Sequence, residues 1–154
     1  MVELTGGEPL LQKMVYPLMR HLLADERDVL LETGGSINII QVPTQVGVIL
    51  DLKCPGSGML NNNQWANLDL LKKRKKRGSC DEVKFVLSSE QDVAWAMGIV
   101  RKYRLTDLVP VLFSPVVDRL PLQRLAELIL REKLPIRLQL QLHTRIWPDV
   151  SRGV

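Results

Sequence analysis

Short apolar runs alternate with amphipathic helical patterns along almost all of the 154 residues, and this alternation limits the fold more than any other feature. Apolar side chains recur at three- and four-residue spacing over 10–23, 88–103 and 121–133. Strand-like runs occupy residues 2–5, 28–33, 46–53, 82–87, 109–113 and 136–142. Strands separated by helices predict an α/β fold with a mostly parallel sheet. The sequence contains no internal repeat or linker, so residues 1–154 are predicted to form one domain.

Local signals set the predicted helix boundaries. Pro9 suits the first helical position, because the N–H that proline lacks would have no partner there. Pro17 lies inside the first helical stripe and is expected to kink or split that helix. Ser88 and Gln91 have the spacing of a capping box, which predicts the start of the helix over 88–103. Residues 54–63 are rich in Pro, Gly, Ser and Asn and are expected to form a loop.

The positive charge of the chain is concentrated in one segment. Lys72–Arg77 contains six consecutive cations; without them, 15 of the 21 Lys and Arg residues remain against 17 acids, a net charge of −2. Since like charges repel, the segment is expected to be a solvated loop that is dispensable for folding. The alternative is contact with a polyanion such as tRNA, in which case salt would weaken the binding steeply.

The cysteines and the apolar runs narrow the class of protein. Two cysteines, Cys54 and Cys80, are too few for a disulfide framework or for an unaided iron–sulfur cluster. No apolar run approaches the ~18 residues of a membrane-spanning helix, and the sequence does not open with a signal peptide. A cytoplasmic protein is therefore expected. Cys54 is interpreted as a small loop residue, and Trp65, Trp95 and Trp147 as packing anchors.

Polar and glycine residues recur where the predicted strands end. These positions are Thr5–Glu8, Glu32–Gly35, Asp51–Gly58, Ser114–Pro115 and His143. The carboxyl ends of parallel strands meet at one edge of a sheet, where α/β folds bind their ligands. Together the positions predict a ligand site, whereas either glycine pair taken alone is more typical of a tight turn.

Thr5-Gly6-Gly7-Glu8-Pro9 resembles the Gly-Gly-Glu-Pro motif of radical S-adenosylmethionine enzymes. Other segments resemble one family among these enzymes, the 7-carboxy-7-deazaguanine synthases of the 7-deazapurine (queuosine) pathway. They are 31–35, in which Gly34 replaces an asparagine, 51–58, 67–69, 81–86, 112–116 and 137–143, with Trp147 and the closing 152–154. The resemblance covers nearly the whole chain, and it implies a partial (β/α) barrel of the radical S-adenosylmethionine type that is missing its first strand.

The resemblance implies a lyase that converts 6-carboxy-5,6,7,8-tetrahydropterin into 7-carboxy-7-deazaguanine by ring contraction with loss of ammonia. The implied cofactors are S-adenosylmethionine, a 4Fe–4S cluster and Mg²⁺. An electron donor such as flavodoxin is an implied partner, a homodimer is compatible with the family, and neither a membrane nor nucleic acid is expected to take part. The residues implied to bind S-adenosylmethionine are Gly6, Gly7, Glu8, Glu32, Asp51, Leu52, Lys53, Ser114 and Pro115. The implied substrate contacts are Thr5, His143 and the terminal carboxylate of Val154.

Several of these residues also have plainer interpretations. Glu32 could cap a neighbouring helix, Lys53 could be a cation at the rim of the sheet, and His143 could be a surface histidine. A branched side chain at Gly7, by contrast, is expected to abolish cofactor binding if the main chain approaches the cofactor there.

One part of the family pattern is absent from the sequence. In the family three cluster cysteines precede the Gly-Gly-Glu-Pro motif, and Cys54 and Cys80, 26 residues apart, do not reproduce a CxxxCxxC. The chain thus resembles the family without its first strand, its cluster loop and its amino-terminal substrate contacts, and catalytic competence is not expected without them. A late-assigned start, a gene fragment or a split protein would each explain this. The alternative function is a non-catalytic remnant or split-protein subunit that binds a polyanion through Lys72–Arg77.

Overall fold

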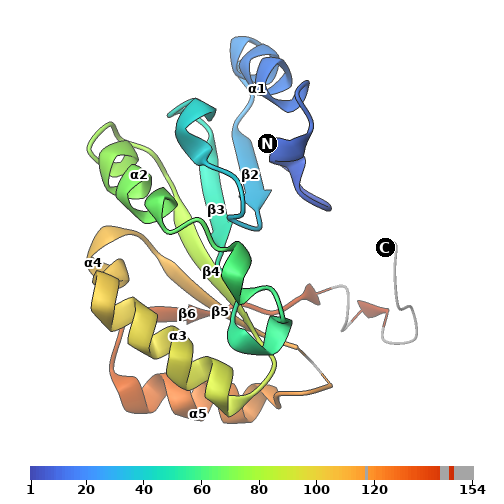
Figure 1. The fold of residues 1–154 in the computed structure, drawn as a ribbon. Coiled ribbons are helices and arrows are strands. Elements are labelled where there is room, and N and C mark those ends of the chain that lie inside the picture. The colour runs from blue at the N-terminus through green and yellow to red at the C-terminus, as the bar shows by residue number, and fades with distance from the viewer. Residues whose placement is uncertain (117, 143–145, 148–154) are drawn as a thin grey trace.

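The computed structural model describes residues 1–116, 118–142 and 146–147, which are built around a six-stranded sheet (Figure 1). The strands are β1 Val2–Leu4, β2 Val29–Thr33, β3 Gly47–Asp51, β4 Glu82–Leu87, β5 Val111–Pro115 and β6 Ile136–Leu138. Their order in the sheet is their order in the chain, and every neighbouring pair is parallel. The α/β fold with a parallel sheet that the sequence predicts is confirmed.

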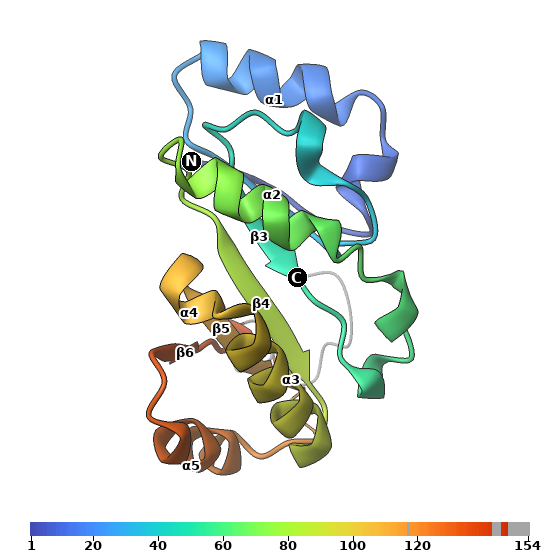
Figure 2. The same ribbon diagram turned by 60° about the vertical axis from the view of Figure 1, so that its left-hand side comes forward.

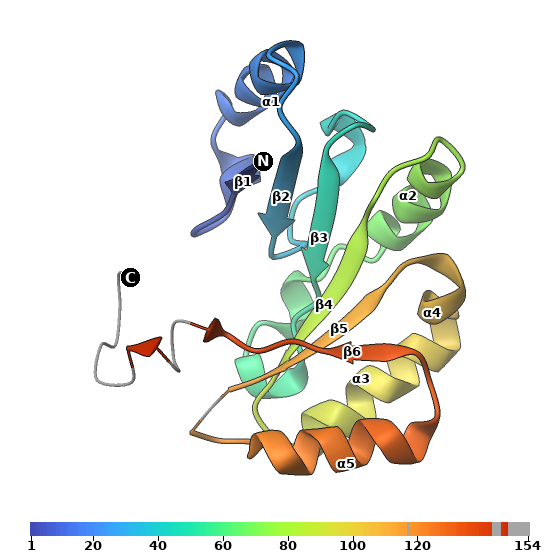
Figure 3. The same cartoon turned by 180° about the vertical axis from the view of Figure 1, so that it is seen from behind.

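The strand order explains why the helices lie on one side of the sheet. A connection between parallel strands is almost always right-handed, so a sheet that always adds its next strand on the same side receives its helices on a single face. The helices are α1 Val15–Ala24, α2 Ala66–Lys75, α3 Glu90–Tyr103, α4 Leu105–Leu108 and α5 Leu122–Glu132. Short 3₁₀ helices occupy Pro9–Leu11, Ile39–Gln41, Pro55–Ser57 and Leu60–Asn62. Figures 2 and 3 show the helices outside the curved sheet, which does not close into a barrel.

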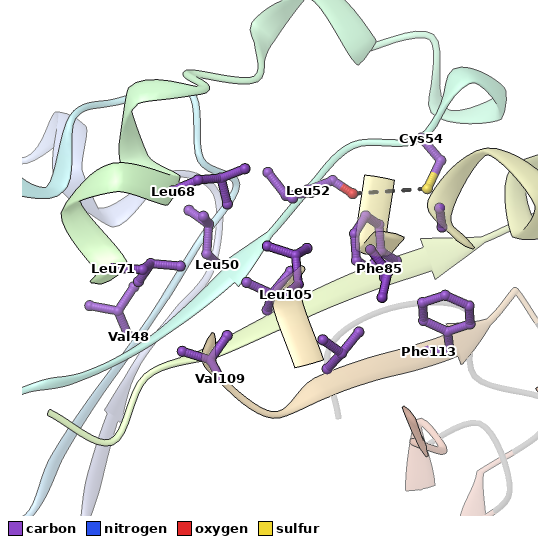
Figure 4. Packing of buried hydrophobic residues seen from close by; sticks show 14 of the residues in the cluster. Val48, Leu50, Leu52, Cys54, Leu68, Leu71, Phe85, Leu105, Val109 and Phe113 are labelled. Carbon is purple, nitrogen blue, oxygen red and sulfur yellow. Dashed lines mark hydrogen bonds between the residues drawn. The ribbon is translucent and has the colours of Figure 1, made fainter. Parts of the chain in front are cut away.

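The core fills the space between the sheet and the helices (Figure 4). In β4 every second side chain from Val83 to Leu87 is fully buried, whereas the intervening side chains are only partly buried on the other face. The rings of Phe85 and Phe113 meet edge to face with their centroids 5.5 Å apart. Because each such side chain stabilises the fold by about 1.5–3 kcal/mol when buried, this layer holds the centre of the sheet to the helices.

Two of the three tryptophans are packing residues, as expected. Trp65 stacks on Tyr103 with 5.7 Å between ring centroids, and Trp95 lies edge-on to Phe85 at 6.3 Å. Trp147 differs, since 46% of its surface is exposed. In the part of the chain that the structure describes, no helix is long and apolar enough to cross a membrane.

The first helical stripe is interrupted earlier than the sequence predicts. The break falls at residues 12–14, between a 3₁₀ helix and α1, and Pro17 lies in the first turn of α1. The N–H groups of a first turn have no helical acceptor, so the N–H that Pro17 lacks is not needed there. At the other end of the chain, β6 comprises only Ile136–Leu138, shorter than the alternation over 136–142 predicts.

The cap of α3 is one residue later than predicted. The hydroxyl of Ser89 accepts a hydrogen bond from the N–H of Asp92 at 3.2 Å, so Ser89 is the N-cap. Ser88 with Gln91 is therefore not the capping pair. The hydroxyl of Ser88 donates instead to the carboxylate of Asp92 at 2.7 Å, a contact that two adjacent serines in a sequence do not distinguish.

The basic segment Lys72–Arg77 is not a solvated loop, and that prediction is wrong. Helix α2 continues through the segment to Lys75, and Arg74 is only 6% exposed. The guanidinium of Arg74 donates to both carboxylate oxygens of Asp81, at 2.9 and 3.0 Å. It also donates to three main-chain carbonyl groups, those of Val42, Pro43 and Val46. All five N–H groups of the guanidinium are therefore used.

Asp81 connects the same network to the sheet. Its carboxylate is buried and accepts from the N–H of Val48 at 2.9 Å and from the hydroxyl of Ser79 at 2.6 Å. Two charges can be buried together only if their polar groups are satisfied, and here both partners are. The Arg74–Asp81 pair thus fixes the end of α2 to β3 and to the start of β4, and we expect Arg74 to be needed for stability.

Replacing Arg74 by methionine is expected to lower the free energy of unfolding by about 3–5 kcal/mol, because the charge of Asp81 is left buried without its partner. Lys73→Met is the matched control, since it removes an exposed cation from the same turn and should change stability by less than about 0.5 kcal/mol. Urea denaturation measures both variants. A small effect for Arg74→Met as well would restore the expectation that the segment is dispensable for folding.

Candidate functional site

A cavity of 330 Å³ lies at the carboxyl ends of β1, β2 and β3, the edge at which the sequence predicts a ligand site. Its wall comes from the loop after β1, the end of β2, the end of β3 and the polar loop that follows β3. Small-molecule sites usually measure about 300–1,000 Å³, so the cavity is large enough for part of a cofactor. Seven of the predicted site residues line it: Thr5, Gly6, Gly7, Glu8, Glu32, Asp51 and Lys53.

Glu8 joins the loop after β1 to the end of β2. The hydroxyl of Thr33 lies 2.8 and 2.9 Å from the two carboxylate oxygens of Glu8 and donates to them. The N–H of Gly34 donates to Oε2 at 3.0 Å, and the N–H of Leu10 donates to Oε1 at 3.1 Å. The side chain of Glu8 is thus committed to contacts within the protein that hold two rim loops together.

Gly6 and Gly7 form the part of the cavity wall next to Glu8. Both have positive φ angles, +89° and +56°, which glycine adopts far more readily than other residues. A Cβ placed on either glycine would meet no atom within 4 Å. The backbone conformation therefore requires glycine here, and the space beside these residues is open.

Two ion pairs determine the charge of the site. Lys53 Nζ lies 2.6 Å from Asp51 Oδ2, and Lys84 Nζ lies 2.7 Å from Glu32 Oε1. Lys84 on β4 reaches across β3 to Glu32 on β2. The hydroxyl of Thr5 donates to the other oxygen of Glu32 at 3.4 Å. The formal charges of the two pairs cancel, and the carboxylate of Glu8, which lines the same cavity and forms no ion pair within the described residues, leaves a formal charge of −1.

Two polar atoms near this edge have no hydrogen-bond partner within the described residues. They are Oδ1 of Asp51 and Oγ of Ser114, both buried. Ser114 pairs with Val86 across β4 and β5, and it therefore faces the same side of the sheet as Lys84, two residues before Val86. A buried polar atom without a partner costs free energy, so a group that donated to either atom would be favoured.

The other predicted site residues that the structure describes do not line the cavity. Leu52 belongs to the core, where Figure 4 shows it among the side chains packed beneath the helices. Ser114 and Pro115 are buried at the end of β5, two strands away from Asp51 in the sheet. His143 and Val154 lie outside the described residues.

Asparagines to which the sequence analysis assigned no role hold the rim loops in place. Asn63 pairs with the main chain of Lys53: its Oδ1 accepts from the N–H and its Nδ2 donates to the carbonyl, both at 2.9 Å. Asn67, buried in α2, bonds in the same way with the main chain of the segment 35–39. Asparagine is common in turns of many kinds, and its long-range partners are not indicated by the sequence around it.

Asp92 anchors the loop after β3 to the start of α3. Its carboxylate accepts from the N–H of Gly56 at 2.8 Å and from the N–H and hydroxyl of Ser88 at 3.0 and 2.7 Å. Burial opposes ionisation of this group, but the hydrogen bonds outweigh burial and hold the pKa of Asp92 below its usual value. A Cβ on Gly56 would lie 2.5 Å from Asp92 Oδ2, so the close approach of the loop requires glycine.

The described residues do not fit a 4Fe–4S cluster. Cys54 follows β3 and Cys80 precedes β4, so the two thiols lie at opposite ends of a parallel sheet. Cys54 is buried, with its thiol directed at the carbonyl of Leu52 (Figure 4), and burial raises the pKa of this thiol far above its usual value. In residues 1–116, 118–142 and 146–147, no group of three or more His, Cys, Asp or Glu side chains could hold a metal ion.

A second and larger cavity, of 850 Å³, runs along the outer edge of β1. It shares Thr5–Glu8 with the smaller cavity, so this loop separates the two. Leu11 and Met14, which line the larger cavity, are 68% and 74% exposed. Its wall is mostly apolar, unlike the charged wall of the smaller cavity.

Proteins named 7-carboxy-7-deazaguanine synthase are similar to this chain over nearly its whole length. The protein from Chlorobaculum tepidum is 40% identical, in a match that covers 99% of this chain and 68% of the relative. The proteins from Koribacter versatilis and Clostridium acetobutylicum are 37% and 34% identical, with 100% and 99% of this chain covered and 72% and 69% of the relatives. No family model matches the chain.

A solved structure shares the fold. The crystal structure of QueE from Escherichia coli superposes with a TM-score of 0.59 at 19% identity, and the match covers 90% of this chain and 55% of that one. At this identity the likeness concerns the fold. It agrees with the partial barrel that the sequence resemblance implies.

Anaerobic reconstitution of the 154-residue chain with iron and sulfide is expected to give no stoichiometric 4Fe–4S cluster, because two thiols at opposite ends of the sheet cannot supply its ligands. The absorbance of thiolate-to-iron bands and the iron content per chain measure this. Cys80→Ser serves as the control for iron bound loosely at the exposed thiol. A stable cluster on the monomer would contradict the expectation.

Asp92→Asn is expected to lower the free energy of unfolding at neutral pH, and the difference from wild type should shrink in acid. The folded-state pKa of Asp92 lies below the unfolded value of 3.8. The stabilisation is thus complete above the unfolded pKa and is lost as the pH falls through the folded pKa. Denaturant melts across this range measure the difference, and a difference independent of pH would show that the charge is not its source.

Proposed function

Because the chain belongs to the 7-carboxy-7-deazaguanine synthase family, we propose that it forms the part of such an enzyme that binds S-adenosylmethionine and a pterin substrate. Membership rests on relatives that are 34–40% identical and of which the chain covers more than two thirds. The family consists of radical S-adenosylmethionine lyases. The proposed reaction is the ring contraction of 6-carboxy-5,6,7,8-tetrahydropterin to 7-carboxy-7-deazaguanine with loss of ammonia.

The meeting of two rim loops, Thr5–Glu8 and Glu32–Gly35, across one cavity is the observation that carries this proposal. In the proposed binding mode Gly6 and Gly7 receive the methionine end of the cofactor, beside Glu8 and Glu32. The open space next to the two glycines supports this, because a ligand can approach their main chain without meeting a side chain. The cavity volume of 330 Å³ suits this part of the cofactor.

The opposite wall of the cavity suits the sugar and carboxylate side of the cofactor. Lys53 supplies a cation there and is paired with Asp51, so a ligand carboxylate can compete for it. We include Leu52, Ser114 and Pro115 on this side of the proposed site. The unpaired Oδ1 of Asp51 and Oγ of Ser114 support a ligand that carries hydrogen-bond donors.

Of the residues proposed to contact the substrate, only one lies within the described part of the chain. Thr5 is the proposed pterin contact, together with His143 and Val154. When bound, S-adenosylmethionine supplies the radical that removes a hydrogen atom from the substrate. Mg²⁺, an electron donor such as flavodoxin, a homodimer and a cytoplasmic location belong to the same proposal. The described residues do not fit the cluster, and turnover is proposed to need thiolates that they do not provide.

The alternative of a polyanion-binding remnant has one cation fewer than the sequence suggests. Arg74 is neutralised by Asp81 and is buried. Nζ of Lys72 lies 3.1 Å from Oδ1 of Asp69. Nζ of Lys75 donates to the main-chain carbonyl of Asp107 in α4. The segment therefore does not present six free cations, and the enzyme interpretation is the one that the site supports.

In a chain supplied with the cluster-binding segment of a relative, Gly7→Val is expected to abolish S-adenosylmethionine binding, because the side chain would fill the open space beside the main chain. Strain at positive φ should also cost about 1–2 kcal/mol of stability. Gly78→Val is the matched control: Gly78 also has a positive φ, +84°, with nothing within 4 Å of a Cβ, and it lies after α2, away from the site.

Calorimetric titration beside a thermal melt separates the two effects. Both variants should melt at lower temperature than wild type, and only Gly7→Val should lose affinity in its folded fraction. Equal affinities in the two variants would contradict the assignment of Gly7 to the cofactor site.

A further inference from the structure

Thr33 ends β2 and is 1% exposed, so its hydroxyl depends on partners inside the protein. It donates to the Glu8 carboxylate, whose two oxygens lie 2.8 and 2.9 Å away, and accepts from the N–H of Gly35 at 3.3 Å. A hydroxyl has one proton, so the two short distances describe one hydrogen bond shared by both oxygens. A continuous chain of hydrogen bonds therefore leads from the main chain of Gly35 through Thr33 to Glu8.

This contact is a link between loops. Of the three donors to the Glu8 carboxylate, Leu10 belongs to the same loop as Glu8, whereas Thr33 and Gly34 belong to β2 and its end. Hydrogen bonds to a carboxylate are stronger than those between neutral groups. The Gly34 donor is a main-chain N–H, which only proline would remove while also restraining the backbone, so the side chain of Thr33 is the part of the link that is tested.

Between β1 and Glu8, the side-chain bond that ties the loop to β2 within the described residues is that of the Thr5 hydroxyl, which donates to Glu32 at 3.4 Å. Gly6 and Gly7 have positive φ angles, and their Cα positions face open space. Their conformation is set by the two ends of the loop: β1, which pairs with β2, and Glu8, which Thr33 holds. A loop that is ordered only when a ligand arrives weakens binding by the entropy of ordering it.

We propose that Thr33 is a positioning residue: its hydroxyl fixes Glu8 and so presets the main chain of Gly6 and Gly7 at the cavity before a ligand binds. Thr33 does not line the cavity and acts through Glu8. The proposal rests on the function proposed above for the identity of the ligand, S-adenosylmethionine. The shape of the empty loop is a separate property that can be measured without ligand.

Two substitutions separate the hydroxyl from the rest of the side chain. Thr33→Val removes the hydroxyl and keeps the shape, and Thr33→Ser keeps the hydroxyl. We expect Thr33→Val to weaken S-adenosylmethionine binding by about tenfold and to speed amide hydrogen exchange at Gly34, whose N–H is bonded to Glu8, by a similar factor. The backbone order parameters of Gly6 and Gly7, measured by NMR relaxation, should fall in the same variant. Thr33→Ser should stay near wild type in all of these measurements.

A double-mutant cycle with Glu8→Ala, which removes the acceptor of the Thr33 hydroxyl, tests whether Thr33 acts through Glu8. If it does, Thr33→Val combined with Glu8→Ala should bind S-adenosylmethionine no more weakly than Glu8→Ala alone. Additive losses of affinity would overturn the proposal. So would a Thr33→Val variant that melts at lower temperature but whose folded fraction keeps wild-type affinity and wild-type exchange, because the hydroxyl would then serve stability alone.

The order of the empty loop tests the positioning role of Thr33 even if the chain does not bind S-adenosylmethionine. An absence of binding would count against the proposed function. Faster exchange at Gly34 and lower order parameters at Gly6 and Gly7 in Thr33→Val, both restored in Thr33→Ser, would still support the positioning role. Unchanged order parameters at Gly6 and Gly7 would overturn it.

Discussion

The right-handed connection between neighbouring parallel strands is the constraint on which the rest of this structure depends. Because each new strand is added on the same side, the helices cover one face and the strands end together at one edge of the sheet. That edge gathers the loops after β1, β2 and β3 into one cavity. The same rule obliges each helix to return to the opposite edge, where the next strand begins.

The two edges are stabilised in different ways. At the starts of the strands, a buried ion pair between Arg74 and Asp81 fixes the end of α2, and its donors and acceptors are all matched with main-chain groups or with each other. At the ends of the strands, single side chains tie polar loops to the sheet: Glu8, Asn63 and Asp92 each bond to the main chain of a distant segment. The second edge leaves the candidate cavity between its ties.

The fold was predictable from the sequence to the extent that its signals are local. The strand over 82–87 is defined by its own alternation, and a set of such strands separated by helices specifies a parallel sheet. The basic segment shows the limit of local reasoning. Counting six like charges predicts repulsion, but one of them, Arg74, has a buried partner in Asp81, and the others near the end of α2 face the negative end of the helix dipole. Only the tertiary structure shows that partner.

The position of the candidate site could be predicted from the sequence, but the side chains that hold its loops in place could not. Strand ends converge by topology, so Thr5–Glu8, Glu32 and Asp51 could be expected together, and they do line one cavity. Asn63, Asp92 and Thr33 are residue types that serve in ordinary turns, and what distinguishes them here is a partner 10 to 36 residues away in the chain.

The charge arrangement shows why such supports matter to a site of this kind. The register of β3 and β4 places Asp51 opposite Lys84, while Lys84 itself is paired with Glu32. In the proposed binding mode Lys53 turns from Asp51 towards a ligand carboxylate, and a buried carboxylate left without any cation nearby would resist that change. With Lys84 held beside it on the neighbouring strand, Asp51 keeps a positive charge within its surroundings. Lys84, which does not line the cavity, would therefore lower the free-energy cost of moving Lys53 from Asp51 to the ligand.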